Sequence, residues 1–246
     1  MINPFLQLKD IQKSFGKEQV LRDIQLQLSE GKTLSLIGSS GSGKTTLLKI
    51  IAGLEHADGG QILLKGRPIE KQAPQHRKII YLYQDALLFP HLTAFENIAF
   101  GLRLQRADNI KAHVKSMLEN LDMLDQAHKM PDQLSGGQKQ RISFGRALVI
   151  KPQLLLLDEP FGALDPEIRS NMQKLFKSLV ASQNLSAIFV THDIKEAIII
   201  GDVIAKIEQG QLKQYDSKTA FYNDKNSGVN NEILFWKHLK KDNNED

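Results

Sequence analysis

The sequence predicts an α/β fold with a mainly parallel sheet, an N-terminal antiparallel β-subdomain and an inserted helical subdomain. A glycine-rich turn lies between an apolar strand, residues 33–37, and a helix, residues 46–52. Residues 154–157 are all leucine, a run typical of a central parallel strand that is covered on both faces. Between these regions, residues 85–150 carry apolar positions at helical spacing, which predicts the inserted helices.

Length and composition restrict the possible classes of protein. A chain of 246 residues, with 41% hydrophobic and 24% charged residues, forms one or two globular domains. It contains no cysteine, which excludes disulfides, thiolate metal sites and cysteine catalysis. A net charge of +4 is mild, so we expect a solvated surface and no nucleic-acid partner. Residues 1–10 lack the apolar core of a secretory signal, and no apolar run approaches the roughly 18 residues that span a bilayer. These observations predict a cytosolic protein.

Three short segments near the N-terminus predict strands: residues 5–11, 24–28 and 61–64. Residues 5–11 alternate loosely and residues 24–28 cleanly between apolar and polar, as half-buried strands do, and residues 61–64 are followed by Lys65 and Gly66. We expect them to form an antiparallel β-subdomain beside the core. Phe15 lies in this region, and its ring is explained equally well as a stacking platform for adenine or as a core aromatic between strands.

Residues 38–45 match the phosphate-binding pattern G-x-x-x-x-G-K-[ST] at every fixed position: Gly38, Ser39, Ser40, Gly41, Ser42, Gly43, Lys44 and Thr45. Glycines let the backbone approach phosphates, and its N–H groups with the helix N-terminus attract anions. We expect Lys44 to reach the β- and γ-phosphates, the Thr45 hydroxyl to hold Mg²⁺, and Thr46 to open the phosphate-binding helix. An ordinary Gly/Ser turn does not explain Lys44 and Thr45. The motif therefore predicts a P-loop NTPase core.

The sequence that follows the P-loop helix predicts a strand and two helices. Residues 79–83 form a short apolar strand that ends at Gln84. Residues 87–92 are apolar and contain a proline, unlike a plain surface loop. Thr93 to Glu96 fits a capping box that opens a helix. Apolar residues at helical spacing over residues 110–121 predict the second helix.

Residues 134–138 read Leu-Ser-Gly-Gly-Gln. A helix start explains Ser135 as the N-cap and Gln138 as its capping-box partner. It does not explain Gly136 and Gly137, because glycine is a poor helix former. Paired glycines at a helix N-terminus favour a ligand that approaches the backbone closely, and a phosphate is the natural candidate.

The leucine strand ends in two carboxylates, Asp158 and Glu159. Ligands of parallel sheets bind beyond the carboxyl ends of the strands, where these residues lie. We expect Asp158 to hold Mg²⁺ and Glu159 to accept a proton from the attacking water. The alternative interpretation is that Asp158 and Glu159 form an ordinary turn before Pro160. The presence of a P-loop in the same chain favours the catalytic interpretation over this one.

Asp165 and Pro166 predict the N-cap and first residue of a helix with a buried apolar stripe over residues 168–180. Residues 187–191 and 203–207 predict two further strands. His192 follows the first of them, at the same sheet edge as Glu159. A structural histidine is the alternative there, and the shared edge favours a contact with the γ-phosphate.

Taken together, these residues resemble the ATPases of ATP-binding cassette (ABC) transporters over residues 6–210. The motifs that carry the likeness occur in the family's order: the P-loop, Gln84, the signature segment 134–138, Asp158 with Glu159, residues 162–165, and His192. The resemblance implies that subunits pair head to tail, so that each ATP lies between one P-loop and the signature of a second ABC ATPase subunit, here a homodimer. It implies that Gln84 touches Mg²⁺ or water and senses the membrane partner. It also implies that Asp165 communicates between sites and that Phe15 stacks on adenine.

The segment 89–101 resembles binding-protein-dependent importers of the maltose, iron, polyamine, sulfate and molybdate branch. Residues 161–166 and 192–202 also resemble quaternary-amine and taurine importers. The resemblance implies an integral-membrane permease, an indirect substrate-binding protein and a place at the cytoplasmic face of the inner membrane. Residues 87–90 are expected to form part of the groove that receives a short helix of the permease. An exporter ATPase, a soluble non-transport ABC protein and a generic P-loop kinase are the alternatives.

We expect residues 1–246 to form a single ABC ATPase domain. Residues 1–84 and 151–225 would form the nucleotide-binding core with its β-subdomain, and residues 85–150 the helical signature subdomain. Residues 226–246 are a short tail, in which residues 233–239 predict one amphipathic helix docked on the core. This tail is too small for an appended regulatory β-domain.

Overall fold

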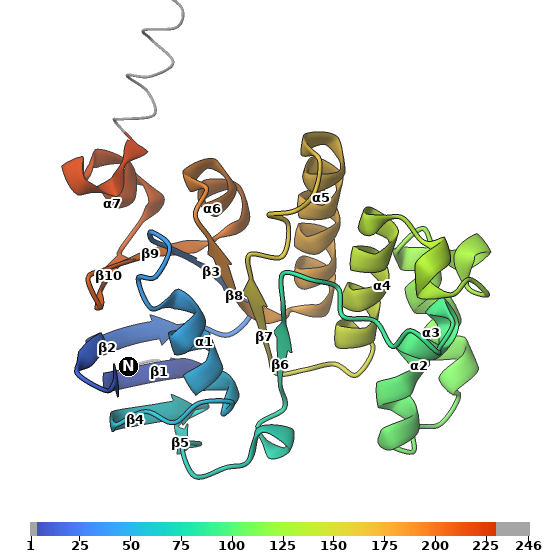
Figure 1. Cartoon of the computed structure of the whole chain (residues 1–246), viewed down its shortest axis with the longest axis horizontal. Helices are drawn as coiled ribbons and strands as arrows, with labels where there is room; N and C mark the ends of the chain where they lie inside the picture. The colour runs from blue at the N-terminus through green and yellow to red at the C-terminus, as the bar shows by residue number, and fades with distance from the viewer. Residues whose placement is uncertain (1–3, 230–246) are drawn as a thin grey trace, which may run out of the picture.

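A computed structural model describes residues 4–229 and contains two sheets (Figure 1). The larger sheet has the strand order β10-β9-β3-β8-β7-β6. Its strands are β3 (Thr33–Ile37), β6 (Ile79–Leu82), β7 (Leu154–Asp158), β8 (Ser186–Thr191), β9 (Val203–Glu208) and β10 (Gln211–Tyr215). All neighbours pair in parallel except β10, which runs antiparallel to β9. The mainly parallel sheet is therefore confirmed, and the leucine strand β7 lies inside it.

The smaller sheet is antiparallel, with the order β2-β1-β4-β5. Its strands are β1 (Leu6–Phe15), β2 (Glu18–Leu28), β4 (Gly59–Leu64) and β5 (Arg67–Pro68). Helix α1 (Lys44–Ala52) packs into one apolar core with this sheet and with one face of the larger sheet. The predicted β-subdomain thus shares its core with the helix that follows the P-loop.

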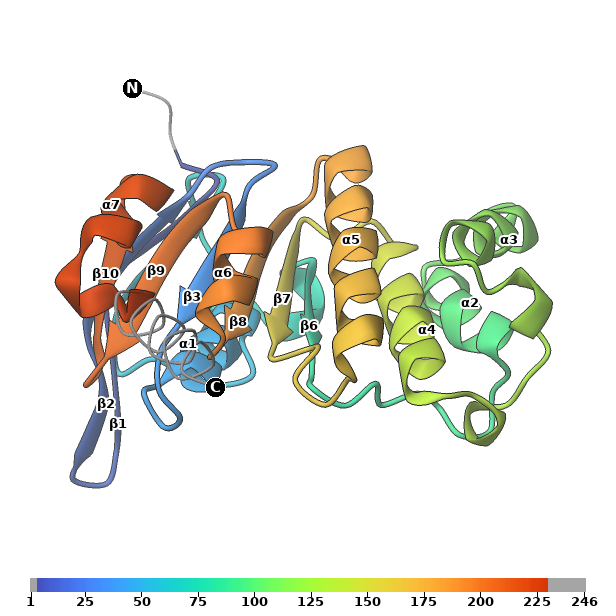
Figure 2. The ribbon, with the colours of Figure 1, turned by 90° about the horizontal axis from the view of Figure 1, so that it is seen from above.

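The remaining helices lie beyond the other face and one end of the larger sheet (Figures 1 and 2). They are α2 (Ala94–Leu104), α3 (Ile110–Asn120), α4 (Gly136–Leu148), α5 (Pro166–Gln183), α6 (Ile194–Ile200) and α7 (Lys218–Asn223). Short 3₁₀ turns occupy Pro74–His76, Leu124–Gln126, Pro131–Gln133 and Lys225–Ser227. Helices α2 to α4 follow β6 and precede β7, so the insertion predicted between these strands is helical.

The predicted helix ends are observed where local chemistry specifies them. Thr93 and Glu96 form a capping box at α2, and Ser135 and Gln138 form one at α4. Gly53 ends α1 with φ 81°, a conformation that glycine adopts without steric cost. Asp165 occupies the N-cap position of α5, but its side chain does not cap the helix.

No helix within residues 4–229 is long and apolar enough to cross a membrane. The amphipathic helix predicted for residues 233–239 lies outside the described residues.

Candidate nucleotide-binding site

The carboxyl ends of three neighbouring strands bring the predicted site residues together. Strand β8 lies between β3 and β7, and all three run parallel. The P-loop leaves β3, the two carboxylates end β7, and His192 follows β8. Segments more than 100 residues apart in sequence meet here, as the Thr45–Asp158 contact with a separation of 113 residues shows.

The P-loop backbone adopts turns that only glycine makes without strain. Gly43 has φ 103°, and a Cβ atom there would lie 2.8 Å from Cδ2 of Leu21. Lys44 is 5% exposed, and its Nζ donates to the carbonyls of Gly38 at 2.9 Å and Ser39 at 2.7 Å. Burial lowers the pKa of Lys44, while the charges of Glu159 and Asp158 oppose that shift. The ammonium group is therefore fixed inside the loop and electrostatically linked to both carboxylates.

The P-loop has the features that a bound phosphate chain requires. The buried Oγ of Ser42 has no hydrogen-bond partner among the described residues, and such a buried polar group calls for a ligand or water. A Cβ atom at Gly41 would meet nothing within 4 Å, so the backbone is open there. A cavity of about 410 Å³ begins at Ser40 and Thr45. Thr46 follows in the first turn of α1 and is partly buried.

Oxygen atoms suited to Mg²⁺ converge at the same edge. Oδ2 of Asp158 accepts hydrogen bonds from Oγ1 of Thr45 at 2.8 Å and from the hydroxyl of Tyr81 at 2.7 Å. Burial first, and the bond to Asp158 second, raise the pKa of Tyr81, so its hydroxyl stays protonated as a donor. Within residues 4–229 no cluster of three His, Cys, Asp or Glu forms a metal cage. This donor set fits Mg²⁺, which is held by one or two carboxylates together with substrate phosphates.

Glu159 is held between two neighbouring strands. Its Oε2 lies 3.0 Å from Nδ1 of His192, and its backbone N–H donates to the carbonyl of Val190 at 3.1 Å. Its φ is 47°, an uncommon value for a residue other than glycine. The two strands therefore fix the direction in which the Glu159 side chain points from the edge of the sheet.

Gln84 reaches the same cavity from the end of β6. The cavity is lined by Ser40, Thr45, Tyr83, Gln84, Asp85, Leu87, Asp158 and Glu159. A Cβ atom built on Gly162 would lie 3.3 Å from Nε2 of Gln84, so the glutamine packs against the loop that follows Glu159. Asp165 lies at the far end of that loop and does not line the cavity.

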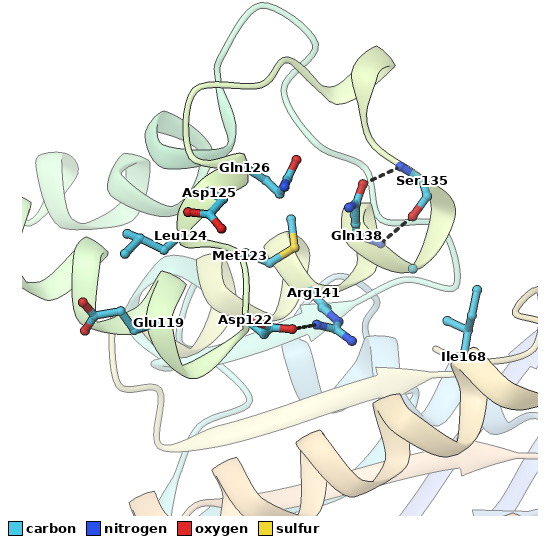
Figure 3. A pocket seen from close by; sticks show the side chains of 11 residues that line it. Glu119, Asp122, Met123, Leu124, Asp125, Gln126, Ser135, Gln138, Arg141 and Ile168 are labelled. Carbon is cyan, nitrogen blue, oxygen red and sulfur yellow. Dashed lines mark hydrogen bonds and ion pairs between the residues drawn. The ribbon is translucent and has the colours of Figure 1, made fainter.

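The signature segment lies elsewhere in the chain. Ser135, Gly137 and Gln138 line a separate cavity of about 610 Å³ in the helical region (Figure 3). A Cβ atom at Gly136 would meet nothing within 4 Å, whereas one at Gly137 would lie 2.7 Å from Cγ2 of Ile168. Gly137 is therefore required for packing, and Gly136 leaves the helix N-terminus accessible. Strands β7 and β6 lie between α1 and α4 (Figures 1 and 2), and the two cavities share no lining residue.

Phe15 also lies outside the P-loop cavity. It ends β1, and its side chain is 49% exposed. Lys13 places its Nζ 5.0 Å from the centre of the ring. A side chain this exposed is not a core aromatic between strands. The exposure therefore favours the other interpretation of Phe15, a stacking platform for adenine.

Two residues beside the cavity were not predicted from sequence. Tyr81 contacts Asp158 because β6 and β7 pair in parallel, and the apolar sequence of β6 carries no signal that this side chain faces the site. Arg146 in α4 donates to the carbonyls of Leu87 at 3.0 Å and Ala86 at 3.4 Å, and thereby holds the segment after Gln84. No local sequence signal distinguishes this arginine from others on helices.

Comparisons with known proteins agree with this geometry. The chain is 44% identical over 218 residues to the sulfate/thiosulfate import ATP-binding protein CysA of Escherichia coli K12, which covers 86% of this chain and 60% of the relative. It is 43% identical over 224 residues to the protein of that name from Ralstonia nicotianae, covering 89% and 60% respectively. The corresponding values for Xanthomonas campestris pv. campestris are 41% over 223 residues, covering 88% and 65%. The chain thus spans about three fifths of the length of these curated relatives. The model of the ABC transporter family matches residues 21–162, and the chain therefore belongs to that family.

Proposed function

We propose that this chain is the ATP-hydrolysing subunit of an ABC importer. The observation that carries the proposal is the meeting of a P-loop, Asp158 and Glu159 at one sheet edge, with His192 bonded to Glu159 at 3.0 Å. Family membership and relatives named as import ATP-binding proteins support the same function. A kinase would not require the signature segment, and the named relatives are importers rather than exporters or soluble ABC proteins.

The residues divide the chemistry of hydrolysis among them. The P-loop backbone and Lys44 bind and orient the β- and γ-phosphates. Thr45, Asp158 and Gln84 would hold Mg²⁺, which when bound would neutralise part of the phosphate charge. Glu159 takes the proton of the attacking water, and His192 orients Glu159 and reaches toward the γ-phosphate. The protein thus contributes positioning and electrostatic stabilisation, the main terms in phosphoryl transfer.

The signature segment would complete the site of a second copy. Ser135, Gly137 and Gln138 line a cavity that shares no residue with the P-loop cavity of their own chain. A head-to-tail homodimer would place each ATP between the P-loop of one chain and the signature of the other. In that arrangement Phe15 stacks on adenine, and Asp165 lies in the loop that communicates between the sites.

Import also requires partners in the membrane. We propose that the segment after Gln84 contacts an integral-membrane permease, because Leu87 is apolar and 58% exposed. A substrate-binding protein would act indirectly through the permease. The chain would then lie peripherally at the cytoplasmic face of the inner membrane, as one ABC ATPase domain over residues 1–246. Its core and β-subdomain would comprise residues 1–84 and 151–225, its helical signature subdomain residues 85–150, and its tail residues 226–246.

The proposed function is tested by measuring ATP binding and Mg²⁺-dependent phosphate release with the purified chain. We expect binding and slow hydrolysis, both lost in Lys44→Ala. Asp158→Asn should retain ATP binding in the absence of Mg²⁺ and lose the Mg²⁺-dependent gain. ATP binding that is indifferent to Lys44→Ala would contradict the proposed site.

A further inference from the structure

Lys13 is a buried cation outside the phosphate-binding cavity. Its side chain is 10% exposed, and its Nζ lies 2.8 Å from Oε1 of Glu55 and 3.4 Å from Oδ1 of Asp58. The same Nζ lies 5.0 Å from the centre of the Phe15 ring. Lysine is almost never fully buried unless it is paired, and here two acids pair with it. Hydrogen bonding to Glu55 is the main cause that raises the pKa of Lys13, which keeps the ammonium charged.

The acid Glu55 is fixed to the P-loop helix. The backbone N–H groups of Leu54 and Glu55 donate to the carbonyl of Lys49 at 2.9 and 3.3 Å. Lys49 lies in α1, which begins at the P-loop residue Lys44. A helix is a rigid connection over this length, so the Glu55 backbone keeps a defined position relative to the phosphate-binding loop.

The acid Asp58 is fixed to β1, the strand that carries Phe15. Its backbone N–H donates to the carbonyl of Gln12 at 2.8 Å, and its Oδ2 accepts the N–H of Ser14 at 2.6 Å. These bonds lie on either side of Lys13. The lysine therefore ties the end of the small sheet to the segment that leaves α1.

We propose that Lys13 is a positioning residue for the nucleobase, which holds the Phe15 ring at a fixed place relative to the P-loop. The proposal rests on the proposed ATP site. A cation is attracted to the face of an aromatic ring, so Lys13 occupies one side of Phe15 and the base stacks on the other. A single nucleotide can then stack its base on Phe15 while its phosphates bind the P-loop. Because the end of β1 is already held in place, binding does not lose conformational entropy by ordering it.

The experiment compares two ligands that differ in the base. Dissociation constants of ATP and of tripolyphosphate are measured by calorimetry for the wild type and Lys13→Met. We expect Lys13→Met to weaken ATP roughly 3- to 10-fold, at or below the low end of the roughly 5- to 150-fold loss of a whole base–aromatic stack, and to leave tripolyphosphate unchanged. Lys13→Arg should retain most of the ATP affinity, because it keeps the charge.

Lys65→Met is the matched control. Lys65 forms an ion pair with Glu30 at 2.7 Å, and its Nζ lies 5.4 Å from the Phe5 ring, away from Phe15. This variant should bind both ligands as the wild type does. Equal weakening of ATP and tripolyphosphate by Lys13→Met would indicate general damage and overturn the proposal.

Phe15→Ala separates this inference from the proposed function. If Phe15→Ala weakens ATP alone and Lys13→Met does not, the base platform stands and the role of Lys13 is wrong. If neither variant changes ATP affinity, the base does not stack on Phe15, and the proposed role of Lys13 is wrong as well. If both weaken ATP and the double variant is no weaker than Phe15→Ala, Lys13 acts through Phe15, as proposed.

Discussion

The Nδ1 atom of His192 lies 3.0 Å from Oε2 of Glu159, across the ends of the neighbouring parallel strands β8 and β7. An ionised carboxylate only accepts hydrogen bonds, so Nδ1 carries the proton of this pair. The imidazole therefore fixes the orientation of Glu159 and presents Nε2 on its other side. His192 is 66% exposed by side chain and Glu159 only 28%, which leaves the histidine accessible to a ligand.

Glu159→Gln should separate ATP binding from hydrolysis. The amide keeps the size of the side chain but cannot accept the proton of water, so we expect turnover to fall roughly 10²- to 10⁴-fold. ATP affinity should persist, and an ATP-bound dimer should accumulate in size-exclusion chromatography. Glu167→Gln, which changes an exposed carboxylate in the first turn of α5, is the control and should hydrolyse normally. Near-normal turnover by Glu159→Gln would remove Glu159 from the role of general base.

Leu87→Asp should weaken assembly with the permease. Within the apolar run 87–90, Leu88 packs against the core of the helical region, and the Phe89 ring lies 4.5 Å from that of Phe100. A charge at Leu88 or Phe89 would therefore disturb folding, whereas Leu87 is 58% exposed. The measurement is the amount of permease that co-purifies from membranes. Ile199→Asp, an exposed position on α6, is the control, and equal co-purification of both variants would place the contact elsewhere.

Asn97→Ala should destabilise the helical region. Asn97 is fully buried, and its amide donates to the carbonyls of Phe89, Leu92 and Thr93 while accepting the N–H of Phe89. Removing it leaves the partly buried N–H of Phe89 and the carbonyl of Leu92 without this partner, at a cost of about 1–3 kcal/mol for each, while the carbonyls of Phe89 and Thr93 keep the N–H groups of Leu92 and Asn97. We expect a loss of about 2–4 kcal/mol in the free energy of unfolding, measured by urea denaturation. The exposed Asn120→Ala should change it by less than about 0.5 kcal/mol, and equal stability of the two would contradict this role.

Mixing two inactive variants should restore a signal if the sites are composite. Lys44→Ala disables the P-loop, and Ser135→Arg fills the open approach to the signature helix. In a mixed dimer one interface combines both defects, and the other combines an intact P-loop with an intact signature. We expect mixing to recover ATP hydrolysis, or ATP-dependent dimerisation if turnover needs both sites.

The control for this mixture is each variant at the same total concentration, which should remain inactive. A site built within one chain would not be rescued by mixing. That result would contradict the head-to-tail arrangement.

The sequence by itself determined the elements whose information is local. The P-loop pattern specifies its turn because Gly43 must adopt a positive φ. The capping boxes at Thr93 and Ser135 need only residues three positions apart. The buried leucine strand β7 needs only its composition. Such signals depend on residues that are close together in the sequence. These elements can therefore be predicted without knowledge of the rest of the fold.

Sequence patterns predicted that the P-loop, Asp158 with Glu159 and His192 meet at one sheet edge, but only the tertiary structure decided which further side chains contact them. Tyr81 and Asp158 are 77 residues apart, and their contact follows from the parallel pairing of β6 and β7. Lys13 meets Glu55 and Asp58 because β1 passes the end of α1. The signature segment and the P-loop line separate cavities because α1 and α4 pack against different parts of the larger sheet. Strand order and helix packing bring distant side chains together through the burial of a common core, and no short pattern of residues encodes that arrangement.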